Sequence, residues 1–409
     1  MTEKIDYDVV IAGGGMIGAS LAIALEPLGL RIAVVEPVAS GEREQPSFDE
    51  RSTALSRSTQ RTYEAMGLWP DIVAASTPIR SIHVSEKGRF GFSHLDADEQ
   101  QVEALGYVVI NRVLGEVLRE RLARLTNVDF KCPSRITAVQ SQENSVIATV
   151  DAGSSRSQLR CRLLVAADGA RSSVRQMLGV GASNVDYQQR AVIGNVLPEL
   201  PPQHRAFERF TRDGPIAMLP IADGRAAFVW ILPPDRAHAI LQLDDASFTN
   251  ELQESFGLRL GTFSKVGQRA AYPLALTRAN ALYAGRGVLV GNAAHGLHPV
   301  AAQGFNLGMR DVAALCDCLL EARQEAGDIG AVNVLENYAE WRREDQRKLV
   351  RFTDGLVRLF GDGRRPIRLL RNVGMLGFDL IPGFRSLFAR HTMGLAGKLP
   401  RLSRGVPLK

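Results

Sequence analysis

Short, mostly apolar runs recur along the first part of this chain of 409 residues. Residues 8–12 (DVVIA), 31–35 (RIAVV) and 163–167 (LLVAA) are of this kind. Runs without polar alternation are expected of strands that are buried on both faces of a parallel sheet. Helical spacing lies between them, as in residues 111–125, where leucines share one stripe. The pattern predicts an α/β fold built on a parallel sheet.

The pattern changes to that of an antiparallel sheet over residues 191–276. Residues 216–221 and 226–232 have the composition of strands, and the Asp223-Gly224 pair between them is a strong hairpin signal. The parallel domain is therefore expected to be interrupted by a sheet domain. Because most buried aromatic residues serve packing, the large apolar side chains are expected in a core rather than a pocket. These side chains are Phe207, Phe210, Met218, Phe228 and Trp230.

A glycine-rich turn follows the first apolar run at once. The sequence GGGMIG at residues 13–18 leads into a helical pattern and a second strand that ends at Glu36. In this context Gly13 makes the turn, Gly15 lets the backbone approach a pyrophosphate, and Gly18 lets helix and strand pack closely. Glu36 lies 18 residues after Gly18, where an acid accepts hydrogen bonds from ribose hydroxyls. The segment predicts a dinucleotide site without distinguishing FAD from NAD.

Three further places have residues that suit a dinucleotide. Arg51 precedes a predicted helix and could reach a flavin or a pyrophosphate; a solvated surface arginine is the alternative. Arg112 stands at the start of another predicted helix, where a cation is unfavourable unless it meets phosphate. Asp168 and Gly169 follow a strand at the end where α/β folds place ligands, and a simple Asp-Gly turn is the rival interpretation.

Residues 288–311 (VLVGNAAHGLHPVAAQGFNLGMRD) join a short buried strand to a helix that begins near Gly304. A helix N-terminus presents unpaired N–H groups and a partial positive charge, which suit an anion or an oxygen that becomes electron-rich during a reaction. An ordinary strand-to-helix connection is the alternative. We expect His295 and His298 in this loop to bond to nearby backbone rather than to titrate, and no general base is identified.

The positive charge of the chain is concentrated at its C-terminal end. The formal net charge is +5, and residues 341–409 contain 16 Lys and Arg against 5 Asp and Glu. Arginines alternate there with large apolar residues, a combination that could rest on anionic lipid headgroups, pack on the protein or bind a partner subunit. Nucleic acid is not expected as a partner, because no recognised binding module frames the charge.

The expected location is the cytoplasm, with peripheral contact at the inner face of the membrane as an alternative. No signal sequence precedes the first strand, and no window reaches the roughly 18 apolar residues that a membrane span needs. The cysteines are too few and too scattered for a disulfide framework or a zinc site, so no metal is expected and a reducing compartment is favoured. They are Cys132, Cys161, Cys316 and Cys318.

With these motifs in view, the chain resembles the flavoprotein aromatic hydroxylases that share the fold of p-hydroxybenzoate hydroxylase. The motifs are GGGMIG at residues 13–18, AADGARSSVR at residues 166–175 and GNAAHGLHPVAAQGFNLGMRD at residues 291–311. Within that family the chain is most similar to the ubiquinone-pathway hydroxylases of the 2-octaprenyl-6-methoxyphenol type. The similar segments include FDERSTALS (48–56), RAFERFTRDGPIAMLPIADGR (205–225) and AYPLALTRA (271–279).

The resemblance implies an FAD-binding Rossmann-like domain of the GR2 type, interrupted by an antiparallel β-sheet substrate domain and followed by a helical C-terminal region. The expected FAD-binding domain comprises residues 1–75, 100–180 and 280–340. The substrate sheet comprises residues 76–99 and 181–279, and the basic C-terminal region residues 341–409.

The resemblance also implies bound FAD, NAD(P)H as reductant, and transfer of one atom of O2 to a phenol that bears a polyprenyl chain. Subunits of a ubiquinone-biosynthesis complex are possible partners. By position, the AMP half of FAD would be held by Gly13, Gly15, Gly18 and Glu36, with Arg51 and Arg112 along the cofactor and Asp168 and Gly169 on its pyrophosphate side. Pro299 would lie beside the flavin ring, and the backbone of Gly304, Phe305 and Asn306 would face its pyrimidine edge.

Asn292 departs from the wider family, which usually has aspartate at this position. A carboxylate accepts hydrogen bonds with two charged oxygens, whereas an amide offers one neutral acceptor and a donor pair. The substitution is expected to weaken the hold on FAD more than to alter the chemistry.

Other functions on the same scaffold remain open at this point, because fold alone does not settle function. They are an FAD-dependent reductase, a hydroxylase of a different aromatic or isoprenoid substrate, a halogenase, and a non-catalytic FAD-binding subunit. A halogenase should have a lysine deep in the fold, and no lysine stands in a matching motif. A non-catalytic subunit would bind flavin without substrate-dependent consumption of NAD(P)H and O2.

Overall fold

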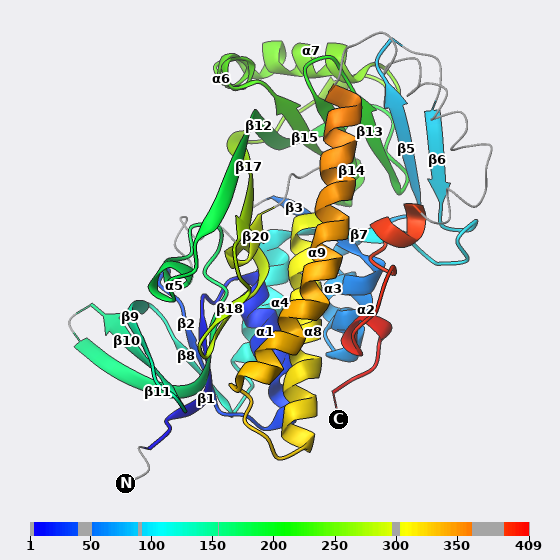
Figure 1. Ribbon diagram of the computed structural model, residues 1–409. Coiled ribbons are helices and arrows are strands. Elements are labelled where there is room, and N and C mark those ends of the chain that lie inside the picture. Colours follow the sequence, from blue (N-terminus) through cyan, green and yellow to red (C-terminus); the bar gives the residue numbers. More distant parts are fainter. Residues whose placement is uncertain are drawn as a thin grey trace.

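The computed structural model describes residues 4–39, 51–88, 92–153, 155–296, 303–361 and 388–408. Its strands form three sheets, and most of its helices gather beside the first (Figure 1). In the described residues the first sheet has the order β18-β19-β11-β1-β2-β8, and β10 and β9 extend it from β11. The bounds are β1 (Tyr7–Ala12), β2 (Ile32–Val35), β8 (Val128–Lys131), β9 (Arg135–Ser141), β10 (Val146–Ala152), β11 (Ser155–Ala166), β18 (Tyr283–Ala284) and β19 (Gly287–Leu289).

The centre of the first sheet is parallel, as its unalternating apolar runs predict. β19, β11, β1, β2 and β8 pair in parallel, so their carboxyl ends lie at one edge. β9, β10 and β18 are antiparallel additions. The short buried strand expected at the start of residues 288–311 is β19, which begins one residue earlier.

Helices α1, α4, α8 and α9 stack beside this sheet (Figure 1). The helical pattern expected after residues 13–18 forms two elements, because Pro27 lacks the N–H that would continue an α-helix and lies in a 3-10 turn instead. The domain boundary placed at residue 341 lies inside α9. The bounds are α1 (Met16–Ala24), η1 (Glu26–Leu28), α2 (Arg57–Ala65), α3 (Trp69–Val73), α4 (Asn111–Leu122), α5 (Ser173–Met177), α8 (Gln303–Gln324) and α9 (Val332–Gly361).

The second sheet is the interrupting domain, with the order β20-β17-β12-β15-β14-β13-β5-β6 and β16 beside β12. It is antiparallel except for β5 against β13, which are parallel. This one parallel pair arises because β5 and β6 come from an earlier segment, so that no hairpin turn sets the direction of β5 against β13. The bounds are β5 (Ser81–Glu86), β6 (Phe92–Asp96), β12 (Ala182–Pro198), β13 (Arg205–Phe210), β14 (Pro215–Pro220), β15 (Ala226–Leu232), β16 (Phe263–Ser264), β17 (Ala270–Ala279) and β20 (His295–Gly296).

The predicted hairpin at Asp223-Gly224 is confirmed. Pro220 pairs with Ala226 across it, and Asp223 has the left-handed φ of 59° that such a turn requires. Helices α6 (Pro234–Leu241) and α7 (Asp245–Phe256) cover one face of the sheet. The predicted aromatic core is confirmed, since the five large apolar side chains are all buried and all but Phe210 pack in the cluster under these helices.

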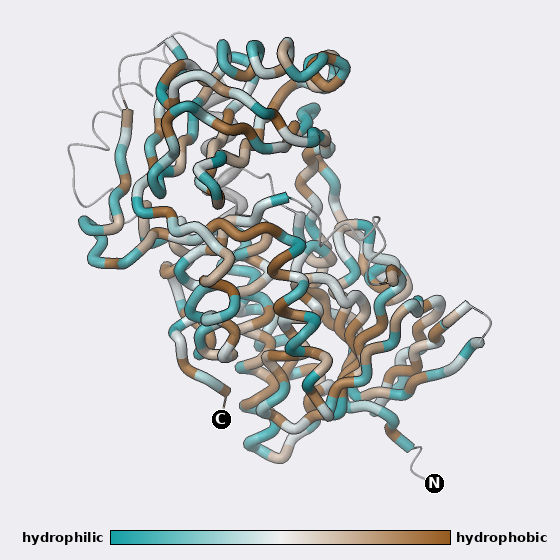
Figure 2. The backbone as a smooth tube through the Cα atoms, turned by 180° about the vertical axis from the view of Figure 1, so that it is seen from behind, coloured by the Kyte–Doolittle hydropathy of each residue, from teal (hydrophilic) through white to brown (hydrophobic). Residues whose placement is uncertain are grey.

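A third, small sheet lies between the other two, with the order β3-β7-β4. Its strands are β3 (Ser52–Ser56), β4 (Ser76–Ile79) and β7 (Gly106–Ile110). β4 therefore pairs outside the large sheet, with which residues 76–99 had been grouped. Figure 2 shows the most hydrophobic backbone in the strands of the first sheet and the helices beside it, where the main core lies.

The described C-terminal residues return to the first domain. The backbone N–H of Ser58 donates to Met393 O at 3.0 Å, and the N–H of Arg401 donates to Asp317 Oδ2 at 2.9 Å. The last turn, η5 (Leu402–Arg404), rests on α2. None of the helices in the described residues combines the length and the apolarity that a membrane crossing needs.

Candidate cofactor and active site

Three sequence motifs meet at the carboxyl edge of the first sheet, because each follows one of the adjacent strands β1, β11 and β19. The turn after β1, residues 13–18, is called the glycine turn. A Cβ on Gly13 would lie 2.6 Å from Ala167 O of the turn after β11, and a Cβ on Gly18 would lie 1.9 Å from Gly13 O. These approaches leave room only for hydrogen, so the packing role predicted for Gly18 is confirmed.

Glu36 faces the glycine turn from the end of β2. It is only 6% exposed, and its carboxylate accepts the N–H of Gly14 at 2.6 Å and that of Val38 at 2.9 Å. Gly15 caps α1 without any side-chain hydrogen bond, so the first N–H groups of the helix have no side-chain acceptor there. A carboxylate and a helix N-terminus are thus placed together, as a ribose and a pyrophosphate require.

The Asp-Gly motif after β11 forms a capped turn. Asp168 accepts hydrogen bonds from Ser172 Oγ, from Ser173 Oγ at 3.3 Å and from the N–H of Val174 at 3.1 Å. Gly169 has a φ of 86°, and a Cβ there would meet no atom within 4 Å. The contacts of Asp168 are those expected of a simple Asp-Gly turn. Gly169, by contrast, has free space beside it in which a ligand could lie.

Arg51 and Arg112 lie close together, although they are distant in sequence. The N–H of Asn111, beside Arg112, donates to Arg51 O at 2.8 Å. The Arg51 guanidinium lies 4.8 Å from the ring centroid of Tyr272 in the second sheet. Arg112 is about half exposed and forms an ion pair with Glu116 at 2.9 Å. Arg51 thus stands between the two large sheets and Arg112 at the surface.

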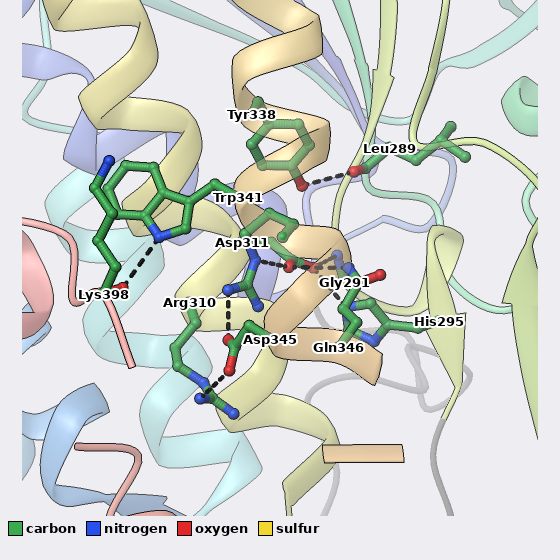
Figure 3. Close-up of polar contacts among 11 residues, drawn as sticks. Leu289, Gly291, His295, Arg310, Asp311, Tyr338, Trp341, Asp345, Gln346 and Lys398 are labelled. Atoms are coloured by element: carbon green, nitrogen blue, oxygen red, sulfur yellow. Dashed lines mark hydrogen bonds and ion pairs between the residues drawn. The ribbon is translucent and has the colours of Figure 1, made fainter. Parts of the chain in front are cut away.

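The loop after β19, residues 291–296, is called the motif loop, and a buried carboxylate holds it. Asp311 of α8 accepts the N–H of Gly291 at 2.9 Å and lies 2.6 Å from His295 Nε2, while Arg342 Nε of α9 donates to its other oxygen at 2.7 Å (Figure 3). Burial alone would raise the pKa of Asp311, but His295 and Arg342 hold it at about 2. The carboxylate is therefore ionised at neutral pH. The expectation of a backbone partner for His295 is wrong: the ring nitrogen meets this carboxylate.

A second ion pair extends the network along α9. Asp345 accepts from Arg342 Nη1 at 2.5 Å and from Arg310 Nη1 at 2.9 Å, and Tyr338 Oη donates to Leu289 O at 2.9 Å (Figure 3). Sequence reasoning missed these residues. The sequence feature that could have identified them is a set of charged and hydroxyl side chains at helical spacing, at 338, 342 and 345, on the face of α9 that packs inward.

The start of α8 is fixed by Asn306. Its amide oxygen accepts the N–H of Ser56 at 2.8 Å and Thr59 Oγ1 at 2.8 Å, and its nitrogen donates to Ala54 O at 2.8 Å. The side chain of Asn306 is thus occupied, which leaves its backbone for a ligand. Gly304 and Phe305 are partly buried, and a Cβ on Gly304 would meet nothing within 4 Å. Asn292 is exposed. Pro299 and His298 lie outside the described residues.

The motif loop also joins the two large sheets, because its strand β20 pairs with β17 at Thr277 and Arg278. The face of the second sheet that points away from α6 and α7 is called the inner face. Ala206 and Leu219 on that face pack against Ala54 of β3. The inner face is therefore turned toward the domain that contains the three motifs.

These features fit a flavin dinucleotide. The glycine turn has the steric demand and the neighbouring carboxylate of an AMP-binding unit, and the open position at Gly304 leaves backbone accessible at the start of a long helix. Among the described residues, no group of three or more His, Cys, Asp and Glu side chains is placed to hold a metal ion.

Residues 6–353 match the family described as FAD binding domain. Ubiquinone hydroxylase UbiL of Rhodospirillum rubrum is 38% identical over 404 residues, which cover 98% of this chain and 93% of that protein. The 3-demethoxyubiquinol 3-hydroxylase of Escherichia coli is 32% identical over 396 residues, covering 95% and 98%.

Among solved structures, p-nitrophenol 4-monooxygenase PnpA from Pseudomonas putida DLL-E4 has a TM-score of 0.79 at 20% identity, and 96% of this chain and 98% of that one are covered. This likeness concerns the fold. Taken with the family match and the meeting of three motifs at one sheet edge, the comparisons establish that the chain belongs to the FAD binding domain family and is an FAD-dependent aromatic monooxygenase.

Proposed function

We propose that this enzyme hydroxylates the aromatic ring of a polyprenylated phenol in ubiquinone biosynthesis, with NAD(P)H and O2 as co-substrates. The observation that supports this most is the junction of the sheets: Arg51 contacts Tyr272 of the inner face, and Ala54 of β3 contacts both that face and Asn306 at the start of α8. Relatives of nearly full length are named for hydroxylation in the ubiquinone pathway.

The chain would hold FAD between the glycine turn and the start of α8. FAD, when bound, supplies the acceptance of hydride and the activation of O2. The N–H groups at the start of α8 would stabilise negative charge on the pyrimidine edge of the reduced ring, since a helix N-terminus has a partial positive charge. Asn306 and Asp311 would keep that helix and the motif loop in place.

The inner face would bind the substrate and exclude water. Its residues include Val229, Ile193 and Ala217, which pair across β12, β15 and β14. An apolar surface of this kind suits an isoprenoid phenol, and it would exclude the water that destroys a reactive oxidant.

The lipid character of such a substrate favours a site of action at a membrane surface. We therefore propose peripheral contact through the basic region of residues 341–409, on the inner face of the cytoplasmic membrane, and association there with other biosynthetic subunits. Vesicles of phosphatidylcholine with added phosphatidylglycerol should sediment the protein at low salt and release it at high salt. Equal sedimentation with uncharged vesicles would contradict the electrostatic contact.

The test of the function is isotopic. The purified holoenzyme, NADPH or NADH, labelled O2 (¹⁸O2) and 2-prenyl-6-methoxyphenol are combined, and the product is examined by mass spectrometry. The proposal predicts one labelled oxygen atom on the ring and NAD(P)H consumption that depends on the phenol. A reductase would consume NAD(P)H without labelling the ring, and a non-catalytic subunit would bind FAD without phenol-dependent consumption.

A further inference from the structure

Glu208 stands on the inner face of the second sheet in an apolar setting. On β13 it is paired with Val84 of β5 and with Ala217 of β14, and Ala217 is paired with Val229 of β15. Paired residues project from the same side of a sheet. Its sequence neighbour Phe207 points to the opposite side, into the core under α6 and α7. An aliphatic side chain at this position would pack as well as a carboxylate and would avoid the cost of desolvating a charge. Packing therefore does not explain a glutamate here.

The row of Glu208 faces the cofactor domain. Ala206, two residues before it, packs with Leu219 against Ala54 of β3. The carbonyl of Ala54 accepts the hydrogen bond from Asn306 at the start of α8. Glu208 is thus two residues along β13 from the place where the inner face meets β3, the strand that contacts the start of α8.

The carboxylate of Glu208 has no partner. It is partly buried, and none of the residues that the structure describes donates a hydrogen bond to it or forms an ion pair with it. Burial alone raises its pKa to about 7. The other ionisable groups on the inner face include Glu86 of β5 and, on β17, Tyr272 and Arg278. Tyr187 of β12 packs with the apolar side chains of this face, and Arg51 lies over the ring of Tyr272.

We propose that Glu208 is a catalytic residue that accepts the proton of the substrate's phenolic hydroxyl, an inference that rests on the function proposed above. In this step the phenol O–H bond breaks, its electron pair remains on the oxygen, and the proton forms an O–H bond with a Glu208 carboxylate oxygen. No atom changes oxidation state. The phenolate that results donates electron density to the ring, which prepares a ring carbon to bond to an electrophilic oxygen.

Transfer of the phenolic proton to Glu208 is less unfavourable than its transfer to a carboxylate of ordinary pKa. A phenol has a pKa of about 10 and an ordinary glutamate has one of 4.5, so proton transfer to a water-exposed glutamate is opposed by between about five and six pKa units. A pKa of about 7 for Glu208 reduces that difference to about three. A base whose pKa lies near the working pH is also largely deprotonated at that pH while it remains basic enough to accept a proton.

The test uses the holoenzymes of the wild type, Glu208→Gln, Glu208→Asp and Glu254→Gln. Glu254 is exposed on α7, on the other side of the sheet. Glu254→Gln therefore makes the same chemical change without altering the inner face, and it is the control. The probe is 2-prenyl-6-methoxyphenol. The readouts are the rate of hydroxylation as a function of pH, the affinity for the probe, and the FAD content.

We expect Glu208→Gln to bind FAD and the probe like the wild type and to hydroxylate the probe about 100-fold more slowly. The wild-type rate should level off above about pH 7, whereas the remaining rate of Glu208→Gln should keep rising toward the pKa of the phenol, about 10. Glu208→Asp should recover part of the rate, and Glu254→Gln should behave like the wild type. A rate of Glu208→Gln within about twofold of the wild-type rate, or an unchanged pH profile, would overturn the role of Glu208 and leave the proposed function standing. If the wild type never hydroxylates the probe, the proposed function itself fails.

A thermal measurement checks that the variant folds. The folded-state pKa of Glu208 lies above its ordinary value of 4.5, so the wild type loses stability as pH rises from 4.5 to 7. Glu208→Gln lacks this loss. It should therefore melt at a higher temperature than the wild type at pH 8, with the difference shrinking toward pH 4.5. A lower melting temperature for Glu208→Gln at pH 8 would show that the carboxylate has a structural partner and would overturn the proposal.

Discussion

The glycine turn and the motif loop both lie at the carboxyl edge of the same sheet, and they are held in place by different means. The glycine turn depends on contacts so short that Gly18 and Gly13 admit no side chain. The motif loop depends on the buried charge of Asp311, which fixes Gly291 and His295 and is itself compensated by Arg342. One region is thus determined by shape and the other by charge.

This difference has a consequence for stability. A steric contact does not change with pH or salt, whereas a buried ion network depends on the protonation of each member. The two regions should therefore respond differently to the same kinds of substitution, and the following predictions use that contrast in order of decreasing effect.

The largest effect is expected for Gly18→Ala. The new Cβ would lie 1.9 Å from the backbone oxygen of Gly13, which cannot move without disrupting β1, so the cost should exceed about 3 kcal/mol. Expression should give little folded, FAD-containing protein by absorbance and calorimetry. Gly304→Ala is the matched change, since its Cβ meets nothing within 4 Å and alanine favours a helix. It should melt no lower than the wild type; equal melting of the two variants would refute the steric account.

Asp311→Asn should cost about 3–5 kcal/mol, because it removes the charge that compensates buried Arg342. Calorimetry should show a lowered Tm, and apo-protein titrations should show weaker FAD binding. Glu344→Gln on the exposed side of α9 is the control, since its ion pair with Lys348 lies in solvent. A Tm for Asp311→Asn as high as that of the control would mean that the network does not support the motif loop.

Acid should act on the motif loop specifically. The pKa of Asp311, about 2 in the folded state against an ordinary 3.8, lies below its unfolded value, so its stabilisation is present above pH 3.8 and is lost as pH falls through 2. This difference between the folded and unfolded pKa of Asp311 corresponds to about 2 kcal/mol of unfolding free energy. The unfolding free energy of the wild type should therefore approach that of Asp311→Asn between pH 4 and pH 2. Parallel curves would contradict this assignment.

The smallest effect is expected for Asn292→Asp. Asn292 is exposed in the motif loop, and a carboxylate there would replace a neutral acceptor with a charge-assisted one for a hydroxyl of the cofactor. FAD should bind up to about tenfold more tightly, as measured by quenching of flavin fluorescence, with hydroxylation little changed. Weaker binding would indicate that the side chain points away from the cofactor.

The contrast between shape and charge also separates what the sequence predicts from what it does not. Gly13, Gly18 and Glu36 are close in sequence and occur at fixed spacings from strands, so local rules identify them. Arg342, the cation that compensates Asp311, comes from α9, 31 residues away, and only tertiary packing brings it and its partner Asp345 toward the motif loop.

Glu208 was not predicted for the same reason. It lies within the segment RAFERF, where nothing in the sequence distinguishes it from any polar residue of an alternating strand. Its apolar neighbours Val84 and Ala217 can be identified only once the register of β5, β13 and β14 is known. The aromatic core and the Asp223-Gly224 hairpin, by contrast, follow from local pattern and were predicted.

The central claim is that one FAD molecule lies against both the glycine turn and the start of α8. Hydrogen-exchange mass spectrometry of the apoprotein with and without added FAD tests it most directly. The account predicts slower exchange of the amides of residues 14–18 and of residues 304–307 together, saturating at one FAD per chain. Unchanged exchange in either segment at saturating FAD would contradict it.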